Sequence, residues 1–255
     1  DINIFEIPLT KLCVEEFSNP KQRLLFKNLG YVGLLASILK MDKGIYETLI
    51  EEQFKGKEKL IEPNVKALDI GYKYAEENFK DMCEIEVVAS NKTDGLILTS
   101  GNDAAGLGCV YGGASVCAWY PITPSTSLAE SFSKYSEQLR IEDDTQKNKF
   151  AFIQAEDELA AVGMTIGANW NGARAFTATS GPGISLMSEF IGLAYFAEVP
   201  SVIFNVQRGG PSTGMPTRTQ QSDILACAYA SHGDTKHVFL IPCDPKECFD
   251  FAADS

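Results

Sequence analysis

The chain has 255 residues, of which 45% are hydrophobic and 22% are charged, and its formal net charge at pH 7 is −12. This composition is typical of a globular protein, and the length suffices for one large domain or two unequal ones. The acidic balance and the lack of a Lys/Arg block exclude a nucleic-acid footprint. No apolar run approaches the roughly 20 residues that span a bilayer, and the sequence has no signal peptide, so we expect a cytoplasmic protein without a membrane partner.

The seven cysteines are interpreted as free thiols of a reducing compartment, because their number is odd and several lie in apolar segments. No two of them have the Cys-x-x-Cys spacing, and the chain has only two histidines. We therefore predict no metal or iron–sulfur ligands within this chain.

Residues 1–80 predict a short strand followed by helices. The segment "NIFEIPL" at 2–8 is strand-like, and helical patterns follow at 22–40, 42–54 and 62–79. Asp42 is a candidate N-cap of the second helix, and Pro63 lies in the first turn of the third. The first helix places one stripe along its length, made of Leu24, Asn28, Val32, Leu35 and Leu39. The region is typical of the helical end of a domain whose beginning is missing.

Residues 81–94 are predicted to be a linker between domains, with a possible strand at 85–89. From residue 95 the chain becomes rich in Gly, Ala, Ser, Thr and Pro, and short apolar segments alternate with helical patterns. This alternation favours an α/β fold with a parallel sheet. The predicted strands lie at 95–99, 150–154, 173–179, 200–206 and 237–242. The helical pattern at 245–255 ends without a cap, so we expect both ends of the chain to belong to a longer protein.

The segment 96–112 predicts a strand, a turn and a helix. Its glycines Gly106, Gly108 and Gly112 superficially match a dinucleotide-binding fingerprint, but they fall inside the helix rather than in the turn that opens it. The favoured interpretation is a helix that packs close to the sheet, with Asn102 or Asp103 as its cap. A nucleotide-dependent dehydrogenase is the corresponding alternative.

Three acidic residues begin the helix after the strand at 150–154. Acids are favourable in a first helical turn, and this explains Glu156 and Asp157. Glu158 differs, because it shares a helix face with Val162 and Ile166 and therefore points inward. A carboxylic acid directed inward needs a partner or a function.

Two prolines stiffen the chain at "YPITPST", residues 120–126, since neither fits a helix interior. The segment predicts a rigid turn before a helix in which Ser127 and Glu130 have capping-box spacing. Farther along, Arg208 follows an apolar strand and precedes a Gly-Gly-Pro turn. An arginine there is suited to a carboxylate ligand, and the alternative is a surface arginine paired with a nearby acid.

Part of this region resembles the pyrimidine-binding domain of thiamine diphosphate enzymes. The resemblance rests on Glu158, on Gly167-Ala168 nine residues later, on the strand that follows and on "TSGPG" at 179–183. With "YPITPSTS", "QAEDELAA", "FAEVP" and "VQRGGPSTGMPTRTQQSD", the chain from 95 to 255 resembles the alpha subunit of 2-oxoacid:ferredoxin oxidoreductases, of the type that acts on 2-oxoglutarate. Residues 1–80, with "IPLTKL" and "FKNLGYVGLL", are similar to the C-terminal part of the gamma-type domain often fused ahead of alpha. The resemblance implies a helical gamma-type segment at 1–80, a linker at 81–94 and a pyrimidine-binding domain at 95–255, truncated at its C-terminus.

The resemblance implies an enzyme that decarboxylates a 2-oxoacid oxidatively, transfers the acyl group to coenzyme A and passes electrons to ferredoxin. Glu158 would be the catalytic residue and would bind the aminopyrimidine of the cofactor. The other cofactor-binding residues implied are Ser180, Gly181, Pro182 and Gly183. The substrate would be bound by Tyr120, Thr123 and Arg208, with Arg208 on its carboxylate.

The resemblance also implies that the chain is active only in a hetero-oligomer. A beta subunit would carry the Mg²⁺ and diphosphate site and the iron–sulfur cluster, for which this chain has no ligand motif. The sequence leaves the substrate open among 2-oxoglutarate, pyruvate, branched-chain 2-oxoacids and indolepyruvate. A non-catalytic assembly subunit is a further alternative.

Overall fold

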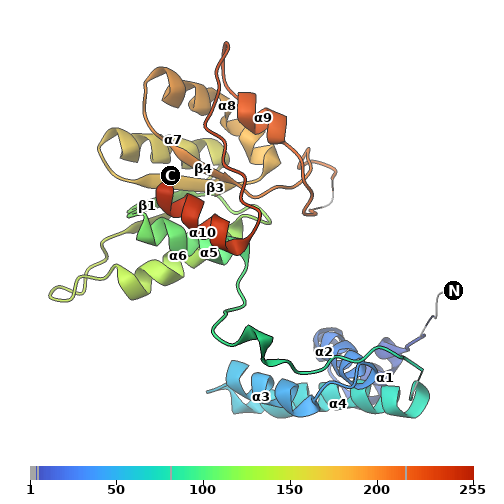
Figure 1. The fold of residues 1–255 in the computed structure, drawn as a ribbon. Helices are drawn as coiled ribbons and strands as arrows, with labels where there is room; N and C mark the ends of the chain where they lie inside the picture. The colour runs from blue at the N-terminus through green and yellow to red at the C-terminus, as the bar shows by residue number, and fades with distance from the viewer. Residues whose placement is uncertain (1–3, 5, 81, 216) are drawn as a thin grey trace. The chain divides into compact units, whose positions relative to one another are not determined.

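The structure, a computed structural model, describes residues 4, 6–80, 82–215 and 217–255. The chain divides into two compact units, Asp1–Leu96 and Ile97–Ser255 (Figure 1). Within the described part of the chain, no helix combines the length and the apolar character needed to cross a bilayer.

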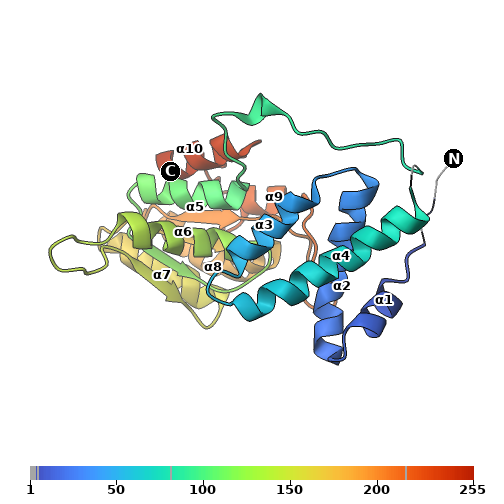
Figure 2. The same ribbon diagram turned by 90° about the horizontal axis from the view of Figure 1, so that it is seen from below.

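The first unit is helical, with α1 (Leu9–Glu16), α2 (Pro20–Ile38), α3 (Lys43–Gln53) and α4 (Ile61–Asn78), and with 3₁₀ turns η1 (Glu58–Leu60) and η2 (Asn91–Thr93) (Figure 2). The predicted cap is confirmed, because Asp42 Oδ1 accepts a hydrogen bond of 2.9 Å from the backbone N–H of Gly44. Pro63 lies in the first turn of α4, as predicted. Capping and proline placement therefore define where these helices begin.

Glycines bring α2 and α4 into backbone contact. A Cβ on Gly71 would lie 1.7 Å from the carbonyl oxygen of Gly30, and a Cβ on Gly33 would lie 2.0 Å from that of Leu68. The stripe that begins at Leu24 is not the buried face of α2, since Leu24 is 73% exposed. The buried face carries Phe26, Gly30 and Gly33. The sequence did not predict this face, because glycines occupy its central positions and the prediction relied on large apolar residues.

Two strands expected in the first unit are not present among the described residues. Residues 4 and 6–8 of the segment 2–8 have no regular structure, and residues 2, 3 and 5 lie outside the described residues. Residues 85–89 are also irregular. Short apolar runs predict strands poorly, because a strand needs a neighbour with which to form hydrogen bonds.

The second unit is built on a parallel sheet of four strands in the order β2-β1-β3-β4, which confirms the predicted α/β class. The strands are β1 (Val116–Trp119), β2 (Ala151–Gln154), β3 (Ala175–Thr179) and β4 (Val202–Asn205). One face is covered by α5 (Gly101–Tyr111), α6 (Thr126–Leu139) and α10 (Pro245–Asp254), and the other by α7 (Glu158–Trp170) and α8 (Gly181–Phe196) (Figure 1). A short helix, α9 (Ile224–Tyr229), packs near α8.

Each face of the sheet has its own buried core. Phe132 of α6 and Phe176 of β3 meet edge to face at 5.0 Å in the core under α5, α6 and α10. On the other face Val162 and Ile166 of α7 pack against Met187 of α8. Burial of this apolar surface on both faces is what fixes the strands in a parallel sheet.

Of the five strands predicted from residue 95 onward, three are present and two are not, and one strand was not predicted. The predictions at 150–154, 173–179 and 200–206 correspond to β2, β3 and β4. Residues 95–99 and 237–242 form no strand, and Leu98 and Val238 are almost fully exposed. Strand β1 was missed, because its four residues lie between the helix predicted to end at 112 and the proline-rich turn at 120–126, where no strand was expected.

The glycines of α5 serve contacts between helices rather than with the sheet. A Cβ on Gly106 would lie 2.9 Å from the backbone nitrogen of Phe132 in α6, and a Cβ on Gly108 would lie 2.4 Å from the carbonyl oxygen of Phe249 in α10. The N-cap is Ser100, and neither predicted residue takes that role. Because no strand precedes α5, the dinucleotide-binding alternative lacks the strand on which it depends.

Candidate functional site

The candidate residues lie at the carboxyl ends of the four parallel strands. Tyr120 follows β1, Glu158 follows β2 after a short turn, Ser180 follows β3 and Arg208 follows β4. Carboxyl ends of parallel strands share one edge of the sheet, and ligands of open α/β sheets bind there. The topology therefore brings the candidate residues from four separate segments to one edge.

The carbonyl oxygen of Thr123 joins three of these segments. It accepts hydrogen bonds from Arg208 Nη1 at 3.0 Å and from Ser180 Oγ at 3.4 Å. The loop after β1 is thus held by the residues that follow β3 and β4. This backbone role was not predicted from the sequence.

Arg208 is a buried residue. Its side chain is only 4% exposed, its Nη2 donates to Ser212 Oγ at 3.0 Å, and its Nε is buried without a partner in the described part of the chain. The alternative of a surface arginine is therefore wrong. A buried guanidinium that uses two of its five N–H donors on the protein retains donors for an anionic ligand.

The loop from 120 to 126 is braced from α5. Asn102 Nδ2 donates to the carbonyl oxygen of Pro124 at 3.0 Å and to Ser127 Oγ at 2.8 Å. The predicted capping box is wrong, because α6 begins at Thr126 and Ser127 bonds to Asn102 instead. The Thr123–Pro124 peptide is cis, and the side chain of Thr123 is exposed while Tyr120 is half-buried. Substrate contact by Thr123 and Tyr120 remains a prediction.

Next to this brace, Asp103 receives hydrogen bonds from the hydroxyls of Ser131 and Ser100. Donors to the charged form of a carboxyl favour that form, so these two serines hold the pKa of Asp103 below its usual range. Asp103 is therefore a structural anion that ties α5 to α6.

Glu158 points inward, as its helical spacing predicts. It is the first residue of α7 and only 9% exposed, whereas the preceding Asp157 is the N-cap and accepts from the N–H of Ala160 at 2.7 Å. No hydrogen bond or ion pair reaches the Glu158 carboxylate from any residue that the structure describes. Glu158 is thus a buried residue whose carboxylate is left free by the described part of the chain, and this group is suited to meet a ligand.

Two glycines let the start of α8 approach the site closely. A Cβ on Gly183 would lie 1.9 Å from Thr179 Oγ1 and 3.1 Å from Glu158 Cγ. A Cβ on Gly181 would lie 1.9 Å from Asp223 Oδ2 and 2.8 Å from the carbonyl oxygen of Arg208. Pro182 occupies the first turn of α8, where its missing N–H has no cost. The segment "TSGPG" is thus a point of close packing between three strand ends.

Sequence reasoning missed several polar groups of this edge. Thr179 Oγ1 and Asn205 Oδ1 are buried without a partner in the described part of the chain, and Ser212 supports Arg208. Asp223 adopts a left-handed backbone conformation with a φ of 64° beside Gly181. Thr179 and Ser212 lie in motifs that the sequence singled out, but no local pattern shows which side chains meet.

Cysteines and acids form no metal centre in the described residues. No group of three or more His, Cys, Asp or Glu side chains among them is placed to hold an ion. All seven cysteines are free thiols, and burial raises the pKa of Cys117 and Cys109 far above the usual thiol value. Buried thiols of this kind are inert packing residues.

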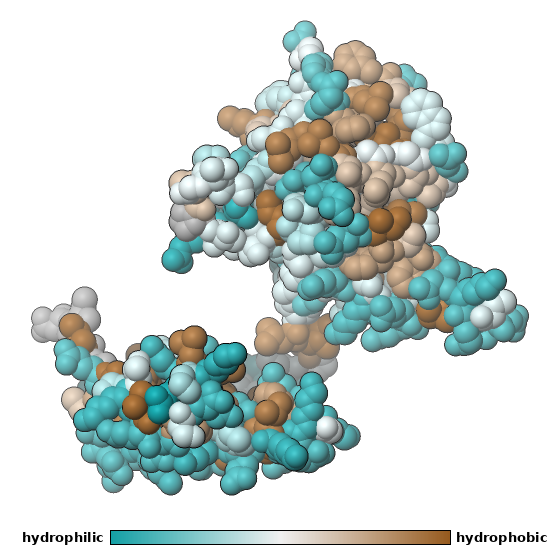
Figure 3. All heavy atoms as spheres, turned by 180° about the vertical axis from the view of Figure 1, so that it is seen from behind, coloured by the Kyte–Doolittle hydropathy of each residue, from teal (hydrophilic) through white to brown (hydrophobic). Residues whose placement is uncertain are grey.

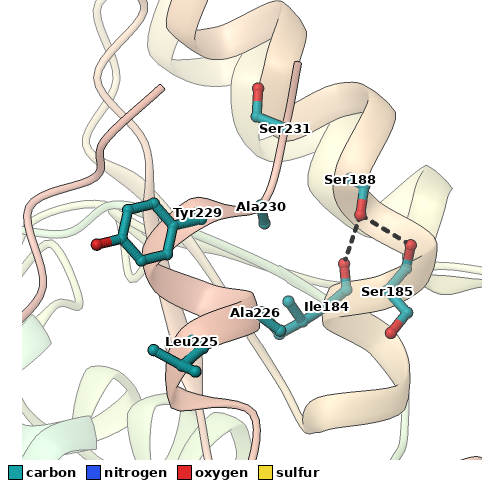
Figure 4. Close-up of a pocket in the computed structure, with 8 residues that line it drawn as sticks. All are labelled: Ile184, Ser185, Ser188, Leu225, Ala226, Tyr229, Ala230 and Ser231. Carbon is teal, nitrogen blue, oxygen red and sulfur yellow. Dashed lines mark hydrogen bonds between the residues drawn. The ribbon is translucent and has the colours of Figure 1, made fainter. Parts of the chain in front are cut away.

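A pocket of about 310 Å³ lies apart from these residues, between α8 and α9 (Figure 4). Figure 4 shows that Ser188 donates within its own helix, to the carbonyl oxygens of Ile184 and Ser185. None of the candidate residues lines this pocket, and no charged side chain does. The sheet edge is therefore the better candidate for chemistry.

Comparison with known proteins assigns families to both parts of the chain. Residues 107–255 match the family described as pyruvate flavodoxin/ferredoxin oxidoreductase, thiamine diphosphate-binding. Residues 1–74 match the family described as pyruvate ferredoxin/flavodoxin oxidoreductase.

Several relatives cover much of the chain. The 2-oxoglutarate oxidoreductase subunit KorA of Mycobacterium tuberculosis is 36% identical over 90% of this chain and 34% of its own length. The 2-oxoglutarate synthase subunit KorA of Methanothermobacter thermautotrophicus is 47% identical over 59% of this chain and 38% of its own. The chain thus spans little more than a third of the length of these relatives.

A solved structure also matches. It is the 2-oxoglutarate:ferredoxin oxidoreductase from Magnetococcus marinus with 2-oxoglutarate, coenzyme A and succinyl-CoA bound, at a TM-score of 0.74 and 32% identity over 97% of this chain and 41% of that one. The match with the thiamine diphosphate-binding model extends over more than half of the chain and contains every candidate residue. The chain therefore belongs to the pyruvate flavodoxin/ferredoxin oxidoreductase family, in its thiamine diphosphate-binding part.

Proposed function

We propose that the chain is part of the alpha subunit of a 2-oxoacid:ferredoxin oxidoreductase that acts on 2-oxoglutarate. In this proposal residues 1–80 are the C-terminal part of a gamma-type domain, 81–94 are a linker and 95–255 are a pyrimidine-binding domain. The family matches at 1–74 and 107–255 support this division, and the relatives named for 2-oxoglutarate support the substrate.

One observation carries the proposal most directly. Glu158, a residue only 9% exposed, places a carboxylate without a partner in the described part of the chain beside the glycine-rich start of α8. The residues at this place fit an aminopyrimidine ring, because a carboxylate can share a proton with a ring nitrogen and Gly183 leaves no Cβ in the way. Glu158, Ser180, Gly181, Pro182 and Gly183 would hold that ring.

Thiamine diphosphate, when bound, supplies a nucleophilic carbon that adds to the ketone of a 2-oxoacid and accepts the electron pair left by carbon dioxide. The chain's own part is proton transfer and positioning. Glu158 would hold or release a proton at the pyrimidine nitrogen.

Arg208 would bind the substrate carboxylate. Its guanidinium is fixed by Thr123 and Ser212 and retains a buried Nε–H without a protein partner among the described residues. A fixed planar guanidinium recognises a carboxylate with two parallel hydrogen bonds. Thr123 and Tyr120, on the loop that Arg208 holds, would line the substrate site.

The proposed site is shared with other chains. A beta subunit would supply the Mg²⁺ and diphosphate site and the iron–sulfur cluster, coenzyme A would accept the acyl group, and ferredoxin the electrons. Apolar side chains of α7 and α8 are exposed, including Leu159, Met164, Trp170, Leu186 and Leu193, and hydrophobic patches are visible on the second unit in Figure 3. Exposed patches of this kind favour a protein partner, and we expect the assembly to operate in the cytoplasm.

The proposal is tested by co-purifying the native complex and measuring reduction of a viologen dye with coenzyme A and each candidate 2-oxoacid. We expect 2-oxoglutarate to have a higher kcat/KM than pyruvate, a branched-chain 2-oxoacid or indolepyruvate, and we expect the isolated chain to be inactive. Preference for another 2-oxoacid would correct the substrate. Turnover by the isolated chain, or no turnover of any 2-oxoacid by the complex, would refute the shared-site proposal.

A further inference from the structure

Strand β3 presents two hydroxyls to the side of the sheet covered by α7 and α8. Thr177 and Thr179 alternate with Phe176 and Ala178, which belong to the core on the opposite face. Both threonines are 0% exposed, and neither Oγ1 has a hydrogen-bond partner in the described residues. A buried hydroxyl without a partner is unfavourable, so valine would pack at least as well at either position.

Thr179 differs from Thr177 in what surrounds it. The position that a Cβ on Gly183 would occupy lies 1.9 Å from Thr179 Oγ1 and 3.1 Å from Glu158 Cγ. Two atoms that are this close to one point are at most about 5 Å apart. The carboxylate oxygens of Glu158 lie two bonds beyond Cγ, so a hydrogen bond between one of them and the hydroxyl is within the reach of a side-chain rotation.

We propose that the Thr179 hydroxyl is a positioning group that donates a hydrogen bond to the Glu158 carboxylate and holds it toward the pyrimidine of the cofactor. The proposal rests on the proposed function, because it gives Glu158 its orientation for that role. The missing Cβ at Gly183 leaves both side chains room to approach each other beneath the start of α8.

Glu158 needs such a group. It is the first residue of α7, and no described residue forms a hydrogen bond or ion pair with its carboxylate. A side chain with three rotatable bonds is held in one orientation only by packing or by a donor. On the neighbouring strand, the Asn205 amide donates to Cys227 Sγ rather than to Glu158.

The test uses the assembled complex with Thr179→Val, Thr179→Ser and the matched control Thr177→Val. Three quantities are measured for each: kcat for 2-oxoglutarate, the dissociation constant of thiamine diphosphate by titration calorimetry, and the midpoint of thermal unfolding. We expect Thr179→Val to unfold at the wild-type temperature or above it, and to lose roughly 10- to 100-fold in kcat, as expected for a hydrogen bond to a charged group. Its dissociation constant should rise by a smaller factor.

Thr179→Ser should recover most of the lost activity, because it restores the donor, and Thr177→Val should equal the wild type in all three quantities. A merely structural role would lower the unfolding midpoint and would not be rescued by serine. Thr179→Ala removes the same hydroxyl and replaces Thr179→Val in these measurements if the valine variant does not fold. Wild-type kcat and affinity in the variants without the hydroxyl would overturn the inference.

Glu158→Gln separates this inference from the proposed function. Loss of turnover in Glu158→Gln together with normal turnover in Thr179→Val would overturn the role of Thr179 alone. Normal turnover in Glu158→Gln would refute the catalytic role of Glu158 and, with it, the inference.

Discussion

Substitution of Gly183 by alanine tests the packing on which the candidate site depends. The added Cβ would lie 1.9 Å from Thr179 Oγ1 and 3.1 Å from Glu158 Cγ, so the threonine hydroxyl must retreat by about 1.5 Å to reach ordinary contact distance. Threonine is stiff at χ1 and Thr179 is fully buried, and overpacking of this kind costs about 1–3 kcal/mol. Alanine is also favoured over glycine in a helix by up to about 1 kcal/mol, which partly offsets the cost.

A matched control separates these two effects. Gly167 of α7 has no atom within 4 Å of its would-be Cβ, so Gly167→Ala gains the helical preference without crowding. We expect the unfolding midpoint of Gly183→Ala to lie below that of Gly167→Ala by roughly 2–12 °C, from about 2–4 °C per kcal/mol for a unit of this size. Thermal unfolding followed by circular dichroism measures the difference. Equal midpoints, or a higher midpoint for Gly183→Ala, would refute the close approach of Thr179, Gly183 and Glu158.

Three further predictions concern other parts of the second unit. Arg208→Lys should lower kcat/KM for 2-oxoglutarate in the complex about 10- to 100-fold with little change in cofactor affinity, because the bidentate contact with the substrate carboxylate is lost. The control Arg218→Lys, at an exposed residue, should change neither quantity. Because the pKa of Asp103 is lowered in the folded state, its stabilisation is complete about one unit above the unfolded pKa, near pH 5, and is lost as the pH falls through the lower folded pKa. Asp103→Asn should therefore lower the unfolding midpoint more at about pH 7 than at about pH 2. An equal effect at both would contradict this role. Alkylation of the native chain, read by peptide mass spectrometry, should modify the exposed Cys243 and spare the buried Cys117, and early labelling of Cys117 would show that β1 is not in the core.

The sequence predicted those parts of the site that depend on local periodicity. The inward direction of Glu158 follows from its spacing to Val162 and Ile166, and the structure buries it. The positions of β2, β3 and β4 follow from apolar segments with turn signals. These features are encoded within a few residues of chain.

Features that depend on contacts between distant segments could not be predicted. The carbonyl oxygen of Thr123 is bound by Arg208, 85 residues away, through a backbone atom that no side-chain pattern reveals. The close approach of both Thr179 and Glu158 to Gly183 depends on the absence of a side chain at that position. The predicted strand at 95–99 failed for the opposite reason, since Leu98 has a strand-like environment in sequence but no partner strand and is fully exposed.

The central claim is that Glu158 is the catalytic group of this chain. Its most direct test is the turnover of 2-oxoglutarate by the complex that carries Glu158→Gln, a substitution that keeps the shape of the side chain and removes its ionisable proton. The account predicts an unfolding midpoint within a few degrees of the wild type and a loss of nearly all viologen reduction and carbon dioxide release. Wild-type turnover in a folded Glu158→Gln complex would contradict it.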